Sequence, residues 1–309
     1  MTNIRIENKL GAVHAGKASR LYPLITAKTR RIDGNAAAAK TDMLWPVEWW
    51  GLERCELFAR LGKNERHEAL TACNRGILNE AYFIEKSGLA YCAKMMLLAD
   101  STDSAQLFAH IAADEATHLA WIEPYIAEQD KTSPQGQFLS FLSGLIEEHR
   151  PELLIYLVQV ILEGWGLDHY KRLMKNCQDP ALTRVLRRIL KDEALHHHSG
   201  TLLHDASKFS ARDRGTVADA MKFYAELVRV GPQAAIAALD QVAGGLSRRE
   251  LIEVITAMDH PAESARKLDL LRKLMLQPGM EGIVGALEES GYLVPYSAAD
   301  AVSFYLQWR

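Results

Sequence analysis

The sequence predicts an all-α protein, and two observations carry that prediction. Apolar residues recur at helical spacing over long stretches with few prolines, and no segment alternates apolar and polar residues as a half-buried strand would. Turn and capping residues separate these stretches. A length of 309 residues is long for one ordinary domain but suits a helical protein with a large core.

The chain is expected to begin with an N-terminal arm, residues 1–64, because its first 40 or so residues lack sustained periodicity. Trp45, Trp49 and Trp50 then gather around Pro46, which disfavours a continuous helix. We interpret these indoles as closing one end of a helical bundle. A lining for substrate or for electron entry is the alternative.

Residues 65–207 are expected to form a four-helix bundle with one bridging helix. A turn and N-cap at residues 100–104 separate the first two helices, and Pro151 and Asp179-Pro180 open the last two. The expected helices span residues 65–99, from the turn to about 129, 137–148, 151–176 and 180–207. Residues 208–309 read as shorter helices packed on the bundle, with Gly-Pro, Gly-Gly, His-Pro and Pro-Gly pairs between them.

Bulk properties exclude several functional classes. The net charge of −3 and the pI near 6.4 argue against partners such as nucleic acid or an anionic membrane surface. An apolar run long enough to span a bilayer and a signal-peptide core are both missing, so we expect a cytoplasmic protein. The four cysteines form no C-x-x-C pair, which is typical of reduced, buried thiols. A homodimer is compatible with the sequence.

One pattern occurs twice in the predicted bundle. Asp-Glu-Ala-x-His spans residues 114–118 and 192–196, and Glu-x-x-Gly-Leu begins at Glu85 and again at Glu163. Thirty residues separate Glu85 from Glu115 and Glu163 from Glu193, with a predicted turn midway in each case. Equal arms about a turn place the two acids of each unit level with one another in an antiparallel hairpin.

The acids and histidines of this repeat lie on faces that are otherwise apolar, where an unpaired charge is costly. A single Asp-Glu-Ala-x-His is a weak motif, because most such segments are solvated or salt-bridged. Four carboxylates and two histidines at matched spacing instead indicate two metal ions, and the oxygen-rich set favours iron or manganese over zinc. The candidate ligands are Glu85, Glu115, His118, Glu163, Glu193 and His196. Glu80 is rejected because the repeat places Val158 at the matching position.

On these six residues, segment 65–207 resembles the ferritin-like di-iron carboxylate superfamily. The resemblance implies that Glu115 and Glu193 bridge or chelate both irons. It implies that Glu85 and His118 complete one ion's ligands, and that Glu163 and His196 complete the other's.

The resemblance also implies a role for Asp114 and Asp192, which would accept hydrogen bonds from the ligating imidazoles; ordinary surface aspartates are the alternative. It does not identify a subfamily. The positions that distinguish three better-known branches hold Ile122, Leu167 and Ile189 instead of the residues typical of those branches.

Four further residues lie close to the predicted ligands in the sequence. His197 and His204 follow Glu193 by one turn and by three turns, and we interpret them as a core and a half-exposed histidine; an extra ligand or proton donor is the alternative. Gly88 and Gly166 either create room beside the metals or allow close helix packing.

The expected function is that of a non-haem di-iron oxygenase or oxidase. Two iron ions, or one manganese and one iron, would activate dioxygen to oxidise a small organic substrate, with electrons from an external donor. The alternative is an iron-handling ferroxidase without an organic substrate, and a scaffold with a vestigial site is less consistent with six intact ligands. An apolar cavity beside the metals would favour the oxygenase.

Overall fold

The structure of the protein is a computed structural model that describes residues 6–12, 16–29, 43–132, 134, 136–258 and 260–308. Every regular element in these ranges is helical, which confirms the all-α class. Within the same ranges, no helix combines the length and the apolar character that a membrane span requires. The four cysteines are free, and three of them are buried.

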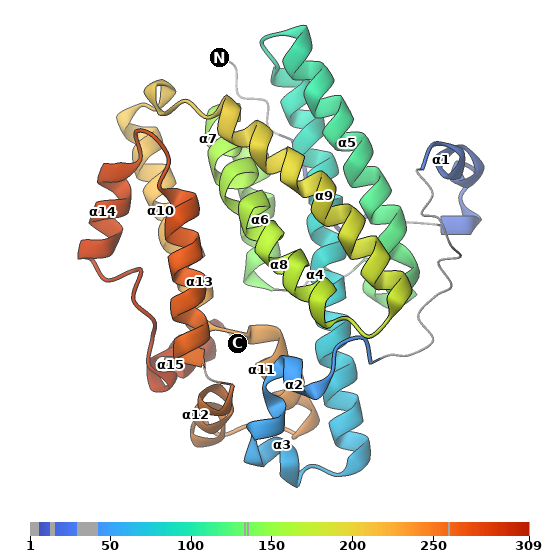
Figure 1. Cartoon of the computed structure of the whole chain (residues 1–309), viewed down its shortest axis with the longest axis vertical. Coiled ribbons are helices and arrows are strands. Elements are labelled where there is room, and N and C mark those ends of the chain that lie inside the picture. Colours follow the sequence, from blue (N-terminus) through green and yellow to red (C-terminus); the bar gives the residue numbers. More distant parts are fainter. Residues whose placement is uncertain are drawn as a thin grey trace.

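Four long helical stretches form two antiparallel hairpins that pack together (Figure 1). The first hairpin joins α4 (Lys63–Leu98) to α5 (Thr102–Ile122). The second joins a run of α7 (Pro151–Leu154), η5 (Ile155–Leu162) and α8 (Glu163–Asn176) to α9 (Pro180–Leu203). α6 (Gln137–Glu148) connects the hairpins and packs on α4.

Both hairpin turns carry the caps that the sequence indicates. The Ser101 hydroxyl accepts a hydrogen bond from the Ser104 amide at 3.1 Å, and the Asp179 carboxylate accepts one from the Leu182 amide at 2.7 Å. These bonds satisfy amides that the first helical turn leaves without partners. The two turns therefore lie midway along each repeat unit, as the spacing of the acids requires.

Two helix ends differ from the expected ones. α5 stops at Ile122 instead of residue 129, and the chain continues as 3₁₀ turns at Glu123–Tyr125 and Glu128–Asp130. Pro124 explains the early end, because proline has no amide to donate and restricts the residue before it. α9 ends at Leu203, with His204 already extended.

The third long stretch is not the uniform α-helix that the sequence indicates. Its η5 segment is a π-helix, with one more residue per hydrogen-bonded turn, and it ends directly before Glu163. A Cβ atom at Gly200 of α9 would lie 2.9 Å from the carbonyl carbon of Gln159. The backbones of η5 and α9 therefore approach closely there, which only glycine permits.

The described part of the N-terminal arm packs on the bundle at residues 6–12. The Asn8 side chain donates to the Ser87 hydroxyl at 3.2 Å, and the Lys86 ammonium donates to the carbonyl of Leu10 at 2.7 Å. α1 (Tyr22–Lys28) has no buried residue. α2 (Val47–Trp50) and α3 (Glu56–Arg60) lie beside the first turns of α4 (Figure 1).

The last third of the chain is helical and packs on the bundle. Its helices are α10 (Ala211–Val230), α11 (Gln233–Val242), α12 (Arg248–Ala257), α13 (His260–Met275), α14 (Glu281–Glu289) and α15 (Ala298–Trp308). α10 and α13 contact η5, and α13 also contacts α8. The first turns of α4 leave the bundle and pack against α11, so that Ala69 and Cys73 share a core with Ala235 and Leu239.

Candidate metal centre

The six predicted ligands converge between the two hairpins. Glu85 comes from α4, Glu115 and His118 from α5, Glu163 from the first residue of α8, and Glu193 and His196 from α9. Five of them are buried and Glu163 is half-buried. On α5 and α9 the acid and the histidine share the inner face of the helix because they are three positions apart.

These side chains form two groups whose donor atoms lie within 4.8 Å of one another. One group consists of Glu85, Glu115, His118 and Glu193, and the other of Glu115, Glu163, Glu193 and His196. Glu115 and Glu193 belong to both groups, so the cluster has the form of two adjoining sites with two shared carboxylates. Each site has one histidine.

The imidazoles turn the same nitrogen toward the cluster. His118 Nδ1 lies 3.0 Å from a Glu85 oxygen and 3.4 Å from a Glu193 oxygen. His196 Nδ1 lies 3.2 Å from a Glu115 oxygen and 3.4 Å from the other Glu193 oxygen. The repeat in the sequence therefore appears in the structure as a nearly two-fold symmetric arrangement of the two histidines.

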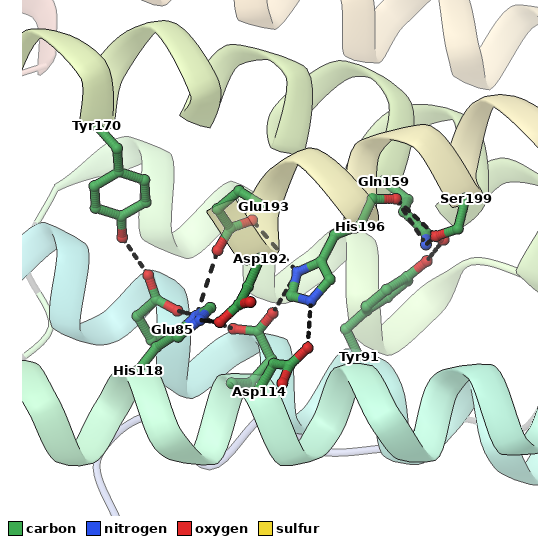
Figure 2. A network of polar contacts seen from close by, with 11 residues as sticks. Glu85, Tyr91, Asp114, His118, Gln159, Tyr170, Asp192, Glu193, His196 and Ser199 are labelled. Atoms are coloured by element: carbon green, nitrogen blue, oxygen red, sulfur yellow. Dashed lines mark hydrogen bonds and ion pairs between the residues drawn. The ribbon is translucent and has the colours of Figure 1, made fainter. Parts of the chain in front are cut away.

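The two aspartates bind the histidines crosswise, each reaching the helix of the opposite repeat unit (Figure 2). Asp192 of α9 lies 3.3 Å from His118 Nε2, and Asp114 of α5 lies 3.3 Å from His196 Nε2. A carboxylate only accepts, so each contact favours the tautomer with the proton on Nε2. The Nδ1 lone pair then faces the cluster, which is the orientation that a metal ligand needs.

The charges of the cluster depend strongly on one another in the metal-free protein, where the surrounding carboxylates raise the pKa of both His118 and His196 against the effect of burial. Burial, followed by the charge of Glu85, raises the pKa of Glu115 to about 8, and burial beside Glu193 raises that of Glu163 well above its usual range. Glu193 Oε2 and His196 Nδ1 are buried, and neither has a well-oriented hydrogen-bond partner among the described residues. Two divalent cations would neutralise the four carboxylates and occupy these two atoms, so the donor set fits a pair of metal ions.

Tyr170 is a functional candidate that sequence reasoning missed. Its hydroxyl donates a short hydrogen bond to Glu85, and the ring is buried on α8, two turns after Glu163 (Figure 2). Extending the repeat by seven residues past Glu85 and Glu163 would have found the position. The repeat pairs it with Cys92, whose thiol is buried. The two candidate sites therefore differ, because a phenol lies beside Glu85 and a buried thiol takes the equivalent place in the repeat.

A second polar network joins α4, η5 and α9 beside the cluster (Figure 2). The Tyr91 hydroxyl donates to the Gln159 side chain at 2.8 Å. The amide of Gln159 donates to the Ser199 hydroxyl at 2.7 Å and to the carbonyl of His196 at 3.1 Å. This buried glutamine fixes the backbone that carries His196.

The two glycines at equivalent positions of the repeat, Gly88 and Gly166, have different surroundings in the structure. A Cβ atom at Gly88 would lie 2.7 Å from the carboxyl carbon of Glu115, whereas one at Gly166 would meet no atom within 4 Å apart from its immediate backbone neighbours. Gly88 therefore allows close packing against a candidate ligand. Gly166 borders open space.

His197 and His204 contribute no donor atom to either ligand group. The His197 ring lies against Gly164, where an added Cβ would be 2.9 Å from the ring. His204 stacks on Tyr156 with ring centroids 4.9 Å apart. Their positions favour packing roles, although His197 Nδ1 and both His204 nitrogens are buried and find no hydrogen-bond partner in the part of the chain that the structure describes.

The three clustered tryptophans divide between core and cavity. Trp45 is fully buried and donates to the carbonyl of Leu173 at 2.9 Å. Trp49 lies between Trp45 and Trp50, with ring centroids 5.8 Å and 4.5 Å away. Trp49 and Trp50 line a cavity.

That cavity has a volume of about 1630 Å³ and reaches the candidate metal centre. Glu85, Glu115, Glu163 and Glu193 all line it, together with Gly88, Gly166 and Tyr170. Glu80, which belongs to neither ligand group, lines it farther along α4. The cavity continues between α4, α8 and α13.

Comparisons with models of known protein families, with curated proteins and with solved structures find no match for this chain. Fold and site define the class: an all-α protein with a buried cluster of glutamates and histidines that fits a pair of metal ions.

Proposed function

We propose that this protein is a dinuclear iron oxidoreductase with a ferritin-like four-helix site, which activates dioxygen to oxidise a small organic molecule. The observation that carries the proposal is the pair of four-donor groups that share Glu115 and Glu193. Two carboxylates that can serve both ions, with one further acid and one histidine for each, suit iron, and a mixed manganese and iron pair is the second metal assignment.

The residues of the chain have distinct roles in this proposal. The metal pair would supply the electrons that reduce dioxygen, and an external donor would restore them. Asp114 and Asp192 orient the two imidazoles, and Tyr170 places a proton beside Glu85. Apolar neighbours keep bulk water away from the cluster, which strengthens every electrostatic contact in it.

A ferroxidase without an organic substrate is the alternative. The cavity favours the organic substrate, because an iron oxidase needs only a path for ions. A volume of about 1630 Å³ next to four candidate ligands exceeds that requirement.

Metal loading tests the proposal. The protein is loaded anaerobically with Fe(II), its metal content is measured, and optical spectra are recorded after exposure to dioxygen. We expect about two ions per chain and a spectral change that Glu115→Ala and Glu193→Ala both abolish, since each removes a carboxylate from both sites.

Asp103→Ala is the matched control, because this acid is exposed at the start of α5, which also carries Glu115. Its metal content should equal that of the unaltered chain. Uptake of fewer than about one metal per chain, or full uptake by both Glu→Ala variants, would refute the dinuclear site. Competition between Fe(II) and Mn(II) during loading distinguishes the two metal assignments.

A further inference from the structure

The cavity has a charged region away from the metal centre, where α4, α8 and α13 face one another. Its charged and titratable lining comprises Glu80, His169, Arg172, Glu263 and Lys267, with the pair Asp168 and Arg266 at its edge. None of these residues belongs to either ligand group. A few charged side chains next to apolar walls are a usual means of orienting a small molecule in a cavity.

Three cations in this region share two paired carboxylates. Glu263 accepts a short hydrogen bond from Arg172 and a contact from Arg266 at 3.3 Å. Arg266 also binds Asp168 at 3.2 Å. Lys267 has only a 3.6 Å contact to Glu263, whose oxygens the two arginines already engage. Its ammonium group is therefore the most weakly paired cation of this region. Burial, joined by the charges of Arg172 and Arg266, lowers the pKa of Lys267, and a bound anion would restore its charged form.

Among the described residues, neither of the remaining two groups, Glu80 and His169, forms an ion pair with Lys267. Burial raises the pKa of Glu80, although the charge of Lys267 opposes this shift, and no hydrogen bond of this side chain is found within the described residues. Burial, reinforced by Lys267 and Arg172, lowers the pKa of His169 to about 4. Burial is the main cause of this lowered pKa, and the charges of Lys267 and Arg172 beside the imidazole add a positive potential that an anion would enter favourably.

Apolar side chains line the same cavity between this region and the metal centre. Ile84 of α4 is four residues from Glu80 and next to Glu85, and Ile161, Leu162 and Trp165 flank Glu163. A molecule that spans the cavity would thus meet a cation at one end, an apolar wall along its length and the candidate metal ligands at the other end.

We propose that Lys267, with His169 beside it, binds the carboxylate of a substrate whose apolar body extends toward the metal centre. One weakly compensated cation matches a singly charged group. A phosphate monoester would bring close to two charges and leave one without a partner. The inference deepens the proposed function by giving its organic substrate a chemical class, and it rests on that function only for the substrate's fate.

Calorimetric titration of the full-length chain as isolated tests the inference, with metal content measured in parallel. Two acids, octanoate and 3-phenylpropanoate, are compared with octanamide and octylamine. We expect at least one acid to bind about tenfold or more tightly than octanamide, the factor that corresponds to about 1.4 kcal/mol. Lys267→Met should abolish that preference, and Glu80→Gln should not weaken it.

Lys273→Met is the matched control, because Lys273 lies on the same helix, is well exposed and pairs with Asp269 outside the cavity. Its binding should be unchanged, and circular dichroism checks that each variant is folded. The inference is overturned if neither acid binds, if amide and acid bind equally, if octylamine binds most tightly, or if folded Lys267→Met retains the preference. Acid binding without iron uptake would instead refute the dinuclear proposal and leave this site standing.

Discussion

Gly88 and Gly166 occupy equivalent positions of the repeat but have different surroundings, so their alanine variants form a matched pair. In Gly88→Ala the new methyl group would lie 2.7 Å from both the carboxyl carbon and an oxygen of Glu115. These atoms end a side chain, so we expect the carboxylate to move instead of the helix. Overpacking of about 1–3 kcal/mol is then partly offset by about 0.5–1 kcal/mol of helix propensity.

The larger effect of Gly88→Ala should appear in metal binding. Glu115 belongs to both ligand groups, so its displacement should lower the binding affinity for each of the two ions by about tenfold or more. Gly166→Ala meets no atom within 4 Å beyond its backbone neighbours and should instead stabilise the protein by about 0.5–1 kcal/mol, as alanine does for glycine within a helix.

Anaerobic Fe(II) titration measures the affinities of both variants, and denaturant unfolding of the metal-free chain measures their stability. Equal iron affinity of Gly88→Ala and Gly166→Ala would refute the reasoning, because it would mean that Glu115 need not hold its observed position. A loss of stability in Gly166→Ala would contradict the open space beside that residue.

Three further predictions concern the groups around the candidate ligands. Asp114→Asn and Asp192→Asn should each lower the affinity of a different one of the two ions by about 10–100-fold, seen in competition with a chelator; equal loss at both ions in each variant would contradict the crosswise contacts. Tyr170→Phe should cost the metal-free chain about 1–3 kcal/mol in denaturant, because it leaves a buried acceptor on Glu85 without its donor; unchanged stability would rule out that hydrogen bond. The folded pKa of His169, about 4, lies below the usual unfolded value of about 6.5, so its stabilising contribution is complete above pH 6.5 and is lost as the pH falls toward 4. His169→Gln should remove up to about 3 kcal/mol of that pH dependence, measured as the difference between two unfolding series; parallel pH curves would contradict the depressed pKa.

The sequence alone determined the helical class, the two hairpin turns and the six residues that meet in the interior. Periodicity is a property of neighbours along the chain, and a gap-free repeat fixes which positions of two hairpins lie level. The choice of Glu85 over Glu80 followed from the repeat. Of these two acids, the structure places Glu85 and not Glu80 in a ligand group. The end of α5 was misjudged because the local effect of Pro124 was overlooked.

Only the tertiary structure decided which partner each of these residues meets. It assigned Asp192 to His118 and Asp114 to His196, and it brought Tyr170 to Glu85. It also gave Gly88 and Gly166 different surroundings. Such contacts depend on the rotation and distance between packed helices, and the periodicity of residues within one helix carries no information about either. The same holds for the cavity, because Lys267 and His169 lie on helices far apart in sequence and become neighbours only when α13 packs against α8.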